Sequence, residues 1–481
     1  MNYRIIFHTV GRILQFEAII FLIPLIISLI YGESANVLAF LIAAVIALGI
    51  GLLLTYVLGK GNRLLFEKEG FAIVAIAWLL MSAIGAIPYV ISREIPSYID
   101  AFFETVSGFT TTGASILPNV EALSKGIMFW HSFTHWLGGM GVLIFIMAIL
   151  PQESGRSIHI LRAEMPGPIV GKMVPKLRET ARILYIIYIV MTIVETLLLW
   201  AGGMSPYESL LHAFGTSGTS GFGIKSDSVA GYAPHLQWMI MIFMLFGGIN
   251  FNLYYLIFAR QFKSAVKSAE LWIYFGIIIV SGIAVTINIL PMYDGLGEAI
   301  RQAFFHVSSL ITTTGYSISN YDMWPNFSKM LLLLLMFVGG CAGSTAGGIK
   351  ILRFILVFKA IFRDIKQMLH PSAVSSIRFD GKKVDDRTIN GISLYFAFYF
   401  IIFFIVLLLL SFEPFDFETN FTATAACFNN IGAGFGGVGP LGNYAAYSPM
   451  AKLLLVFTML LGRLEIFPML LLIMPSFWNK K

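Results

Sequence analysis

The chain has 481 residues, of which 57% are hydrophobic and only 12% are charged. Soluble domains carry roughly 25% charged residues, so this composition excludes a water-soluble protein and indicates an integral membrane protein. The formal net charge of +6 is explained by the sidedness described below and does not indicate nucleic-acid binding. The two cysteines, Cys341 and Cys427, are too few for a disulfide framework or a zinc site.

Ten apolar runs are long enough to cross the roughly 30 Å of hydrocarbon in a bilayer. They lie near residues 11–31, 36–58, 70–92, 126–150, 182–202, 236–259, 270–290, 328–360, 391–411 and 451–474. The first run follows Arg4 and Arg12 but is too long for the apolar part of a signal peptide, so we expect it to span the membrane. The sequence therefore predicts an all-α polytopic membrane protein with about ten transmembrane helices.

Lysine and arginine gather on one side of this predicted topology. They precede the first run and follow the even-numbered runs, as at Arg156 and between Arg363 and Arg387. The opposite side holds Arg93, Lys125, Lys225, Arg301, Lys329 and Lys452. Because cytoplasmic loops carry the excess of positive charge, we expect both termini in the cytoplasm.

Four stretches of the chain align without gaps, and each ends on a glycine. They read DAFFETVSGFTTTG (100–113), ESLLHAFGTSGTSG (208–221), QAFFHVSSLITTTG (302–315) and TNFTATAACFNNIG (419–432). Each begins with a polar residue, continues as an amphipathic helix of about two turns, and becomes small and polar before the glycine. An apolar run precedes each stretch, and a helix with small residues follows it, at Gly138-Gly139, Gly247-Gly248, Gly339-Gly340 and Leu461-Gly462. The repeated unit is thus a span, a short re-entrant helix, a polar loop and a second span.

The predicted topology places all four loops on the outer side. Non-helical backbone at membrane depth is tolerated only where it lines water or is buried in protein. Four such loops around one axis predict a constriction lined by carbonyl oxygens, with a glycine at φ > 0 in each loop and threonine hydroxyls as added ligands. The residues expected to form it are Thr110, Thr111, Thr112, Gly113, Thr219, Ser220, Gly221, Phe222, Thr312, Thr313, Thr314, Gly315, Asn429, Asn430, Ile431 and Gly432.

These loops, together with GGCAGSTAGGIK (339–350) and GRLEIFP (462–468), resemble the Trk/Ktr/HKT superfamily of potassium transporters. The length and the two extra N-terminal spans resemble its TrkH-type pore-forming subunit. The resemblance implies that the filter glycines are Gly113, Gly221, Gly315 and Gly432. Some plant relatives with serine at the first position favour Na⁺, so glycine at all four implies K⁺ selectivity. Asn429, Asn430 and Ile431 replace the hydroxyl residues in the fourth loop, and we expect a slightly asymmetric filter.

The resemblance also implies a location, a cargo and partners. The location is the bacterial cytoplasmic (inner) membrane, among its lipids, and the cargo is K⁺, with Rb⁺ accepted and no organic cofactor in this chain. The implied partners are a second copy of the chain, forming a homodimer, and a cytosolic TrkA-type ring that binds NAD and ATP. Cytoplasmic cations of this chain could contact such a ring, although the positive-inside rule alone would explain them.

The glycine-rich segment 339–350 should interrupt the eighth apolar run. Each glycine costs a helix about 1 kcal/mol, and five lie within ten residues. The unit's symmetry places this segment below the filter, where it resembles the family's intramembrane gating loop; the alternative is a close Gly-xxx-Gly helix contact. The residues expected to form the gate are Gly343, Ser344, Thr345, Ala346, Gly347, Gly348, Lys350 and Arg463. Arg463 lies within a span and should contact this loop, with Glu465 as the alternative partner.

Three further patterns carry weaker alternatives. GFGGVG (434–439) matches a dinucleotide fingerprint but lacks the flanking strand and helix, and His131 with His135 lacks a third zinc ligand. Acidic residues near the starts of the short helices either complement the helix N-termini or attract cations at the mouth. These residues are Asp100, Glu104 and Glu208.

We expect five segments: 1–66 with two extra N-terminal helices, and pore repeats at 67–160, 161–264, 265–372 and 373–481. The expected function is potassium conduction without enzymatic chemistry. The alternatives are a cation symporter that uses the same filter, coupling K⁺ to H⁺ or Na⁺, and an alternating-access transporter, whose repeats are usually inverted. An intramembrane enzyme is a further alternative, but the spans lack a recognisable set of catalytic residues.

Overall fold

The computed structural model describes residues 1–57, 67–141, 177–371 and 376–478. Within them, strands are confined to the hairpin of β1 (Arg378–Phe379) and β2 (Lys382–Lys383). Six described helices are long and apolar enough to cross a membrane, or seven if the bent pair α12 (Pro234–Gly247) and α13 (Phe251–Phe258) is one span. The predicted class, an all-α polytopic membrane protein, is confirmed.

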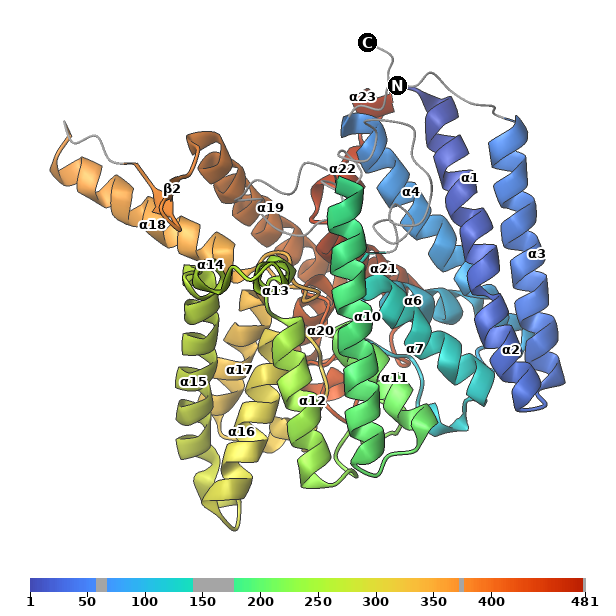
Figure 1. The fold of residues 1–481 in the computed structure, drawn as a ribbon, viewed down its shortest axis with the longest axis horizontal. Coiled ribbons are helices and arrows are strands. Elements are labelled where there is room, and N and C mark those ends of the chain that lie inside the picture. Colours follow the sequence, from blue (N-terminus) through green and yellow to red (C-terminus); the bar gives the residue numbers. More distant parts are fainter. Residues whose placement is uncertain (58–66, 142–176, 372–375, 479–481) are drawn as a thin grey trace.

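The N-terminal helices form a hairpin at one flank of the molecule (Figure 1). They are α1 (Tyr3–Ile20), α2 (Leu22–Ile30) and α3 (Ser34–Val57). α1 and α2 together make one apolar span of 28 residues. A Cβ on Gly11 would lie 2.7 Å from the carbonyl oxygen of Gly51, so α1 and α3 approach through small residues, as membrane helices often do.

Four units with the same order of elements follow this hairpin. Each contains a long helix, a short helix, a loop and a second helix. The long helices are α4 (Glu67–Gly85), which α5 (Ile87–Ile91) extends, α10 (Leu177–Ala201), α15 (Ala269–Ile289) and α19 (Asp386–Leu410). The short helices are α6 (Tyr98–Phe109), α11 (Pro206–Ser217), α16 (Leu296–Ile311) and α20 (Phe417–Phe428). The second helices are α7 (Lys125–Gly139), α12, α17 (Asn326–Val338) and α21 (Pro449–Arg463).

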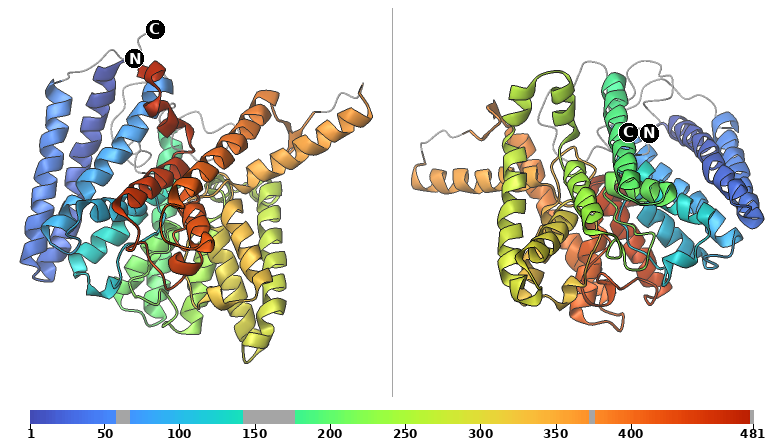
Figure 2. Two further views of the ribbon diagram at one scale, coloured as in Figure 1. Left: turned by 180° about the vertical axis from the view of Figure 1, so that it is seen from behind. Right: turned by 60° about the horizontal axis from the view of Figure 1, so that its bottom comes forward.

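The remaining described helices lie toward the side where both chain ends are found (Figures 1 and 2). They are α13, α14 (Phe262–Val266), α18 (Ile351–Leu369), α22 (Phe467–Ile473) and α23 (Pro475–Trp478). Single 3₁₀ turns lie at Val120–Ala122, Leu290–Met292, Tyr321–Met323 and Gly436–Val438. α18 extends away from the body of the molecule in all three ribbon views.

The short and second helices alternate around a closed ring. Each contacts the next in the order α6, α7, α11, α12, α16, α17, α20, α21 and back to α6. The first and last units therefore meet, and the four short helices surround one central axis. This closure is what one chain needs to build a pore with approximate four-fold symmetry.

The structure corrects two predicted continuous spans, 236–259 and 451–474. In the first, α12 and α13 meet at 90°, because the helix ends at Gly248 and Asn250 begins a new one by accepting a hydrogen bond from the amide of Asn252. In the second, α21 ends before Glu465 and Ile466, whose φ values are 57° and 68°. Residues 142–150 of the predicted run 126–150 lie outside the described residues.

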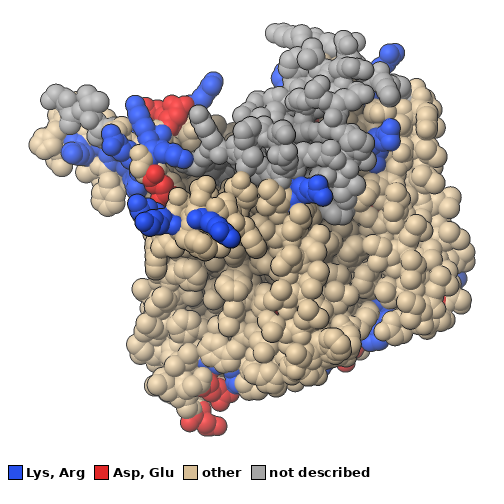
Figure 3. Space-filling view, in the orientation of Figure 1, with Lys and Arg blue, Asp and Glu red and all other residues tan. Residues whose placement is uncertain are grey.

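The surface agrees with insertion in a membrane. A broad band without charged side chains crosses the middle of the visible face, and most visible lysine and arginine side chains lie on the half that holds both termini (Figure 3). Among the exposed side chains are many large apolar ones, such as Val280 at 69% and Ile287 at 68% on α15. Apolar side chains on an outer face are stable where lipid surrounds them.

Candidate ion-binding site

The four loops share an unusual backbone conformation. Their glycines have positive φ, with 75° at Gly113, 60° at Gly221, 87° at Gly315 and 81° at Gly432. Two positions earlier φ is also positive, at Thr111 (55°), Thr219 (52°), Thr313 (55°) and Asn430 (54°). Left-handed residues at alternate positions turn successive carbonyl groups toward the same side. Sequence reasoning anticipated only the glycine of each pair, because three of the four earlier residues are threonines, and β-branched residues rarely adopt φ > 0.

One hydrogen bond recurs in all four loops and fixes this conformation. The amide of the residue before the glycine donates to the carbonyl five residues earlier. The pairs are Thr112 to Ser107 (2.9 Å), Ser220 to Gly215 (2.9 Å), Thr314 to Ser309 (2.8 Å) and Ile431 to Ala426 (2.8 Å). The loops thus remain attached to the ends of the short helices.

Several loop hydroxyls also hold the backbone in place. The hydroxyl of Thr110 donates to the carbonyl of Val106 at 2.7 Å and lies 2.7 Å from that of Thr112. The third loop repeats both contacts, at 2.7 and 2.8 Å, through Thr312 and Thr314. These hydroxyls are already bonded within the protein and support the backbone of the two loops.

The four loops meet in a ring. A Cβ added to each glycine would overlap a carbonyl oxygen of the next unit, namely that of the residue before the loop glycine. The distances would be 1.9 Å from Gly113 to Ser220, 1.8 Å from Gly221 to Thr314, 2.2 Å from Gly315 to Ile431 and 2.5 Å from Gly432 to Thr112. Ordinary carbon–oxygen contacts are far longer. Each glycine therefore allows a close approach between units, in addition to supplying a positive φ.

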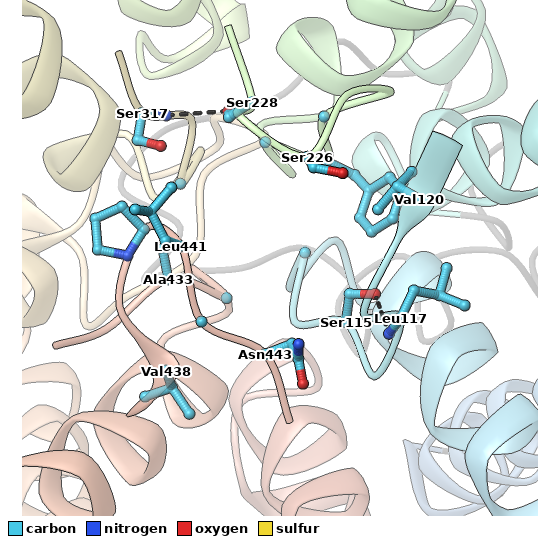
Figure 4. A pocket seen from close by; sticks show the side chains of 18 of the residues that line it. Ser115, Leu117, Val120, Ser226, Ser228, Ser317, Ala433, Val438, Leu441 and Asn443 are labelled. Carbon is cyan, nitrogen blue, oxygen red and sulfur yellow. Dashed lines mark hydrogen bonds between the residues drawn. The ribbon is translucent and has the colours of Figure 1, made fainter. Parts of the chain in front are cut away.

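A cavity of about 130 Å³ opens at this ring, and all four glycines line it. Around the opening, Figure 4 shows side chains of the first unit (Ser115, Leu117, Val120), the second (Ser226, Ser228), the third (Ser317) and the fourth (Ala433, Val438, Leu441, Asn443). A bond from the amide of Ser317 to the hydroxyl of Ser228 joins two units at the rim. The cavity is the entrance to the ring.

The short helices direct their C-terminal ends toward the ring. Three of them begin at side-chain caps, Ser97, Ser205 and Asp416, and all four carry an acidic residue in the first turn. The hydroxyl and amide of Thr419 hold the pKa of Asp416 below its usual range. A helix C-terminus carries about half a negative charge, so four of them favour a cation at the centre.

Segment 339–350 separates α17 from α18, as predicted, and contacts two of the loops. The amide of Gly347 donates to the hydroxyl of Thr313 at 2.6 Å, and the amide of Gly348 donates to the carbonyl of Asn429 at 3.0 Å. Since Thr313 and Asn429 belong to the third and fourth loops, this segment lies directly against the ring.

The other contacts of segment 339–350 are with neighbouring helices. The hydroxyl of Thr345 donates to the carbonyl of Gly247 at 3.0 Å, where α12 breaks, and the amide of Phe251 donates to the carbonyl of Gly343 at 3.0 Å. The amide of Ala342 donates to the carboxylate of Glu270 at 2.7 Å. Sequence reasoning missed Glu270, whose one signal was an acidic residue at the start of an apolar span.

Arg463 joins this segment to the first unit. Its side chain is buried, with 9% exposed. One guanidinium nitrogen donates to the carbonyl of Thr345 at 3.2 Å, and the other donates to the carbonyls of Gly138 and Gly139, the latter at 2.8 Å. The contact expected between Arg463 and the glycine-rich segment is present. Glu465, the alternative partner considered above, forms an ion pair with Arg353 at 2.5 Å.

The remaining candidates lie as follows. The ammonium of Lys350 donates to the carbonyl of Ala346 within the segment. Asp100 pairs with Lys452 at 2.6 Å, which joins the first and fourth units. The ring of His131 stacks on Phe222, with 3.5 Å between ring centroids. Within the described residues, no group of three histidine, cysteine or acidic side chains could hold a metal ion.

Four re-entrant loops that meet in a ring inside a polytopic helical protein define an ion pathway across a membrane. The family described as TrkH, cation transport protein, matches residues 36–480. The chain is 35% identical over 486 residues to the Trk system potassium uptake proteins TrkH of Salmonella typhimurium and of Escherichia coli K12, and each alignment covers 100% of both chains. The crystal structure of the potassium transporter TrkH from Vibrio parahaemolyticus matches it with a TM-score of 0.89 and 31% identity, again over 100% of both chains. The chain therefore belongs to the TrkH family of cation transport proteins.

Proposed function

We propose that this protein takes up potassium through the ring of four loops. The observation that carries the proposal is the closed set of contacts in which each glycine abuts a carbonyl of the next unit. Carbonyl groups fixed in this way can replace the hydration shell of K⁺. The names of the relatives, potassium uptake proteins, agree with this function.

Residues 110–113, 219–222, 312–315 and 429–432 would form the filter. We assign ion coordination to their backbone carbonyls, because several of their hydroxyls are already bonded to the protein. Rb⁺ is close to K⁺ in size and should be accepted. The fourth loop differs in its side chains, and Asn430 uses its amide to bond Thr112 at 3.0 Å and the carbonyl of Met459 at 3.0 Å.

Segment 339–350 would act as the gate. Its bonds to Thr313 and Asn429 support this role, because they hold it against two loops of the proposed filter, where it would obstruct the path. Arg463 adds a buried positive charge that opposes cations and holds Thr345 in place. Transport would require this segment to move aside while the ring remains intact.

The organisation in the membrane follows from charge and exposed apolar surface. We place both termini in the cytoplasm, because most visible lysine and arginine side chains lie on their side (Figure 3). We propose the same division of the chain into five segments, with boundaries at residues 66, 160, 264 and 372, so that each pore repeat holds one short helix and one loop. The host membrane would be the bacterial inner membrane.

Two partners are proposed. A second copy of the chain would cover α18, which extends from the body and exposes Phe362 at 70% and Met368 at 82%. A cytosolic nucleotide-binding ring of the TrkA type would contact cytoplasmic cations of α18, such as Lys359 and Arg363. Arg156 and Arg162, also expected on this side, lie outside the described residues.

Reconstitution of the purified protein in liposomes tests the function. We expect flux of K⁺ and Rb⁺ to exceed that of Na⁺ when the gradient of the permeant ion is the only driving force. A flux that appears only with an added H⁺ or Na⁺ gradient would favour the symporter. Equal flux of all three ions through inserted protein would contradict the proposed filter.

A further inference from the structure

Glu104 is buried inside the protein, so it does not attract cations at the mouth of the pore, which was one interpretation of its position in the sequence. It lies in the middle of the short helix α6, and 1% of it is exposed. Its carboxylate is directed behind the first loop and accepts three hydrogen bonds. The donors are the hydroxyl of Ser115 at 2.7 Å, the amide of Ile116 at 2.9 Å and the Nε2 atom of the His131 ring at 2.6 Å.

The partners of Glu104 connect two adjacent loops. Ser115 and Ile116 belong to the backbone that leaves the ring after Gly113. His131 stacks on Phe222, which directly follows Gly221, with 3.5 Å between centroids. One buried carboxylate therefore fixes the exit from the first loop directly and the exit from the second loop through two stacked rings.

Two other units support the same backbone position without a carboxylate. A ring nitrogen of His306 accepts a hydrogen bond from the amide of Ile318 at 3.4 Å, and the hydroxyl of Thr422 accepts one from the amide of Phe435 at 3.0 Å. Ile318 and Phe435, like Ile116, lie three residues after the loop glycine. This position is thus held from the short helix in three units, and the bond is shortest in the first.

We propose that Glu104 is a positioning residue for ion selection, which holds the first and second loops at the spacing that favours K⁺. The inference rests on the proposed filter function. Bonds to a carboxylate are shorter and stronger than neutral ones. Their loss would leave the amide of Ile116 and the ring of His131 buried without this partner. The loop exit would relax, and the carbonyl ring beside it would lose its fixed spacing.

Three variants in liposomes separate positioning from charge. Glu104→Ala should lower the ratio of K⁺ to Na⁺ flux roughly tenfold, which corresponds to about 1.4 kcal/mol. Glu104→Gln should keep the flux ratio within about twofold of the wild type. Its amide oxygen can accept from the amide of Ile116, and its NH₂ group can donate to the hydroxyl of Ser115 and to the ring nitrogen of His131. Glu17→Gln is the matched control: it removes an equally buried carboxylate from α1, outside the four units, and should leave the ratio unchanged.

Each outcome decides the proposal. A wild-type ratio in inserted Glu104→Ala would overturn it, and so would an equal loss in Glu104→Gln, which would indicate a charge effect. If Glu104→Ala does not insert, Phe222→Leu removes the stacking on His131 and should also lower the ratio; an unchanged ratio there would overturn the link to the second loop. A wild-type protein without K⁺ preference would instead refute the filter itself.

Discussion

Replacement of Gly113 by serine should weaken the discrimination between K⁺ and Na⁺ without preventing insertion. The new Cβ would lie 1.9 Å from the carbonyl oxygen of Ser220. A normal contact requires the two atoms to separate by about 1.5 Å more, a large displacement for a ligand. The φ of 75° at Gly113 adds strain of about 1–3 kcal/mol for a residue with a side chain. We expect a roughly tenfold loss of the flux ratio, or about 1.4 kcal/mol of selectivity.

The assay is the flux of K⁺ and Na⁺ into liposomes that contain equal amounts of inserted protein. Gly32→Ser is the matched control, because Gly32 has a φ of 73° but nothing within 4 Å of an added Cβ. This control experiences the same backbone strain far from the ring and should keep the wild-type ratio. An unchanged ratio in Gly113→Ser would refute the assignment of the first loop to the filter.

Three further predictions concern the gate and the assembly. Deletion of residues 343–347 should raise K⁺ flux and leave the order of ions unchanged, whereas abolished flux in inserted protein would make the segment structural. Arg463→Ala should also raise flux, since it removes the bond to Thr345 and the positive charge. If the deletion and this substitution act through the same contact, the variant that carries both should differ little from either alone. Fully additive effects would mean that Arg463 does not act through the gate. Phe362→Glu on α18 should shift the detergent-solubilised protein from dimer to monomer in light scattering, and an unchanged mass would exclude this face as the interface.

The sequence contained enough information to predict the membrane fold, the four loops and the interruption at 339–350. These features depend on residue type: apolar length, repeated glycines and a cluster of glycines within a span. The contact of Arg463 could also be anticipated, because a charge within a span needs polar partners. The family resemblance is confirmed over essentially the whole chain.

Other features depend on contacts that no local pattern reveals. Thr111 adopts φ > 0 although β-branched residues avoid this region. The hydrogen bond from the amide of Thr112 to the carbonyl of Ser107, at the end of α6, determines its conformation. The end of α12 at Gly248 could not be predicted, because a pair of glycines is as compatible with a close contact between two helices as with the end of a helix. Glu104 sat in a pattern of acidic residues near helix starts, and only the fold showed that its carboxylate is buried behind the first loop.

Anomalous X-ray scattering from crystals of the protein grown in Rb⁺ would show directly whether the ring binds the transported ion. We expect an anomalous peak on the axis of the ring, within coordination distance of the carbonyl oxygens of Thr112, Ser220, Thr314 and Ile431. The peak should disappear or weaken in Gly113→Ser crystals under the same conditions. Rb⁺ bound elsewhere, with the ring empty in protein that transports Rb⁺, would mean that the four loops do not form the ion filter.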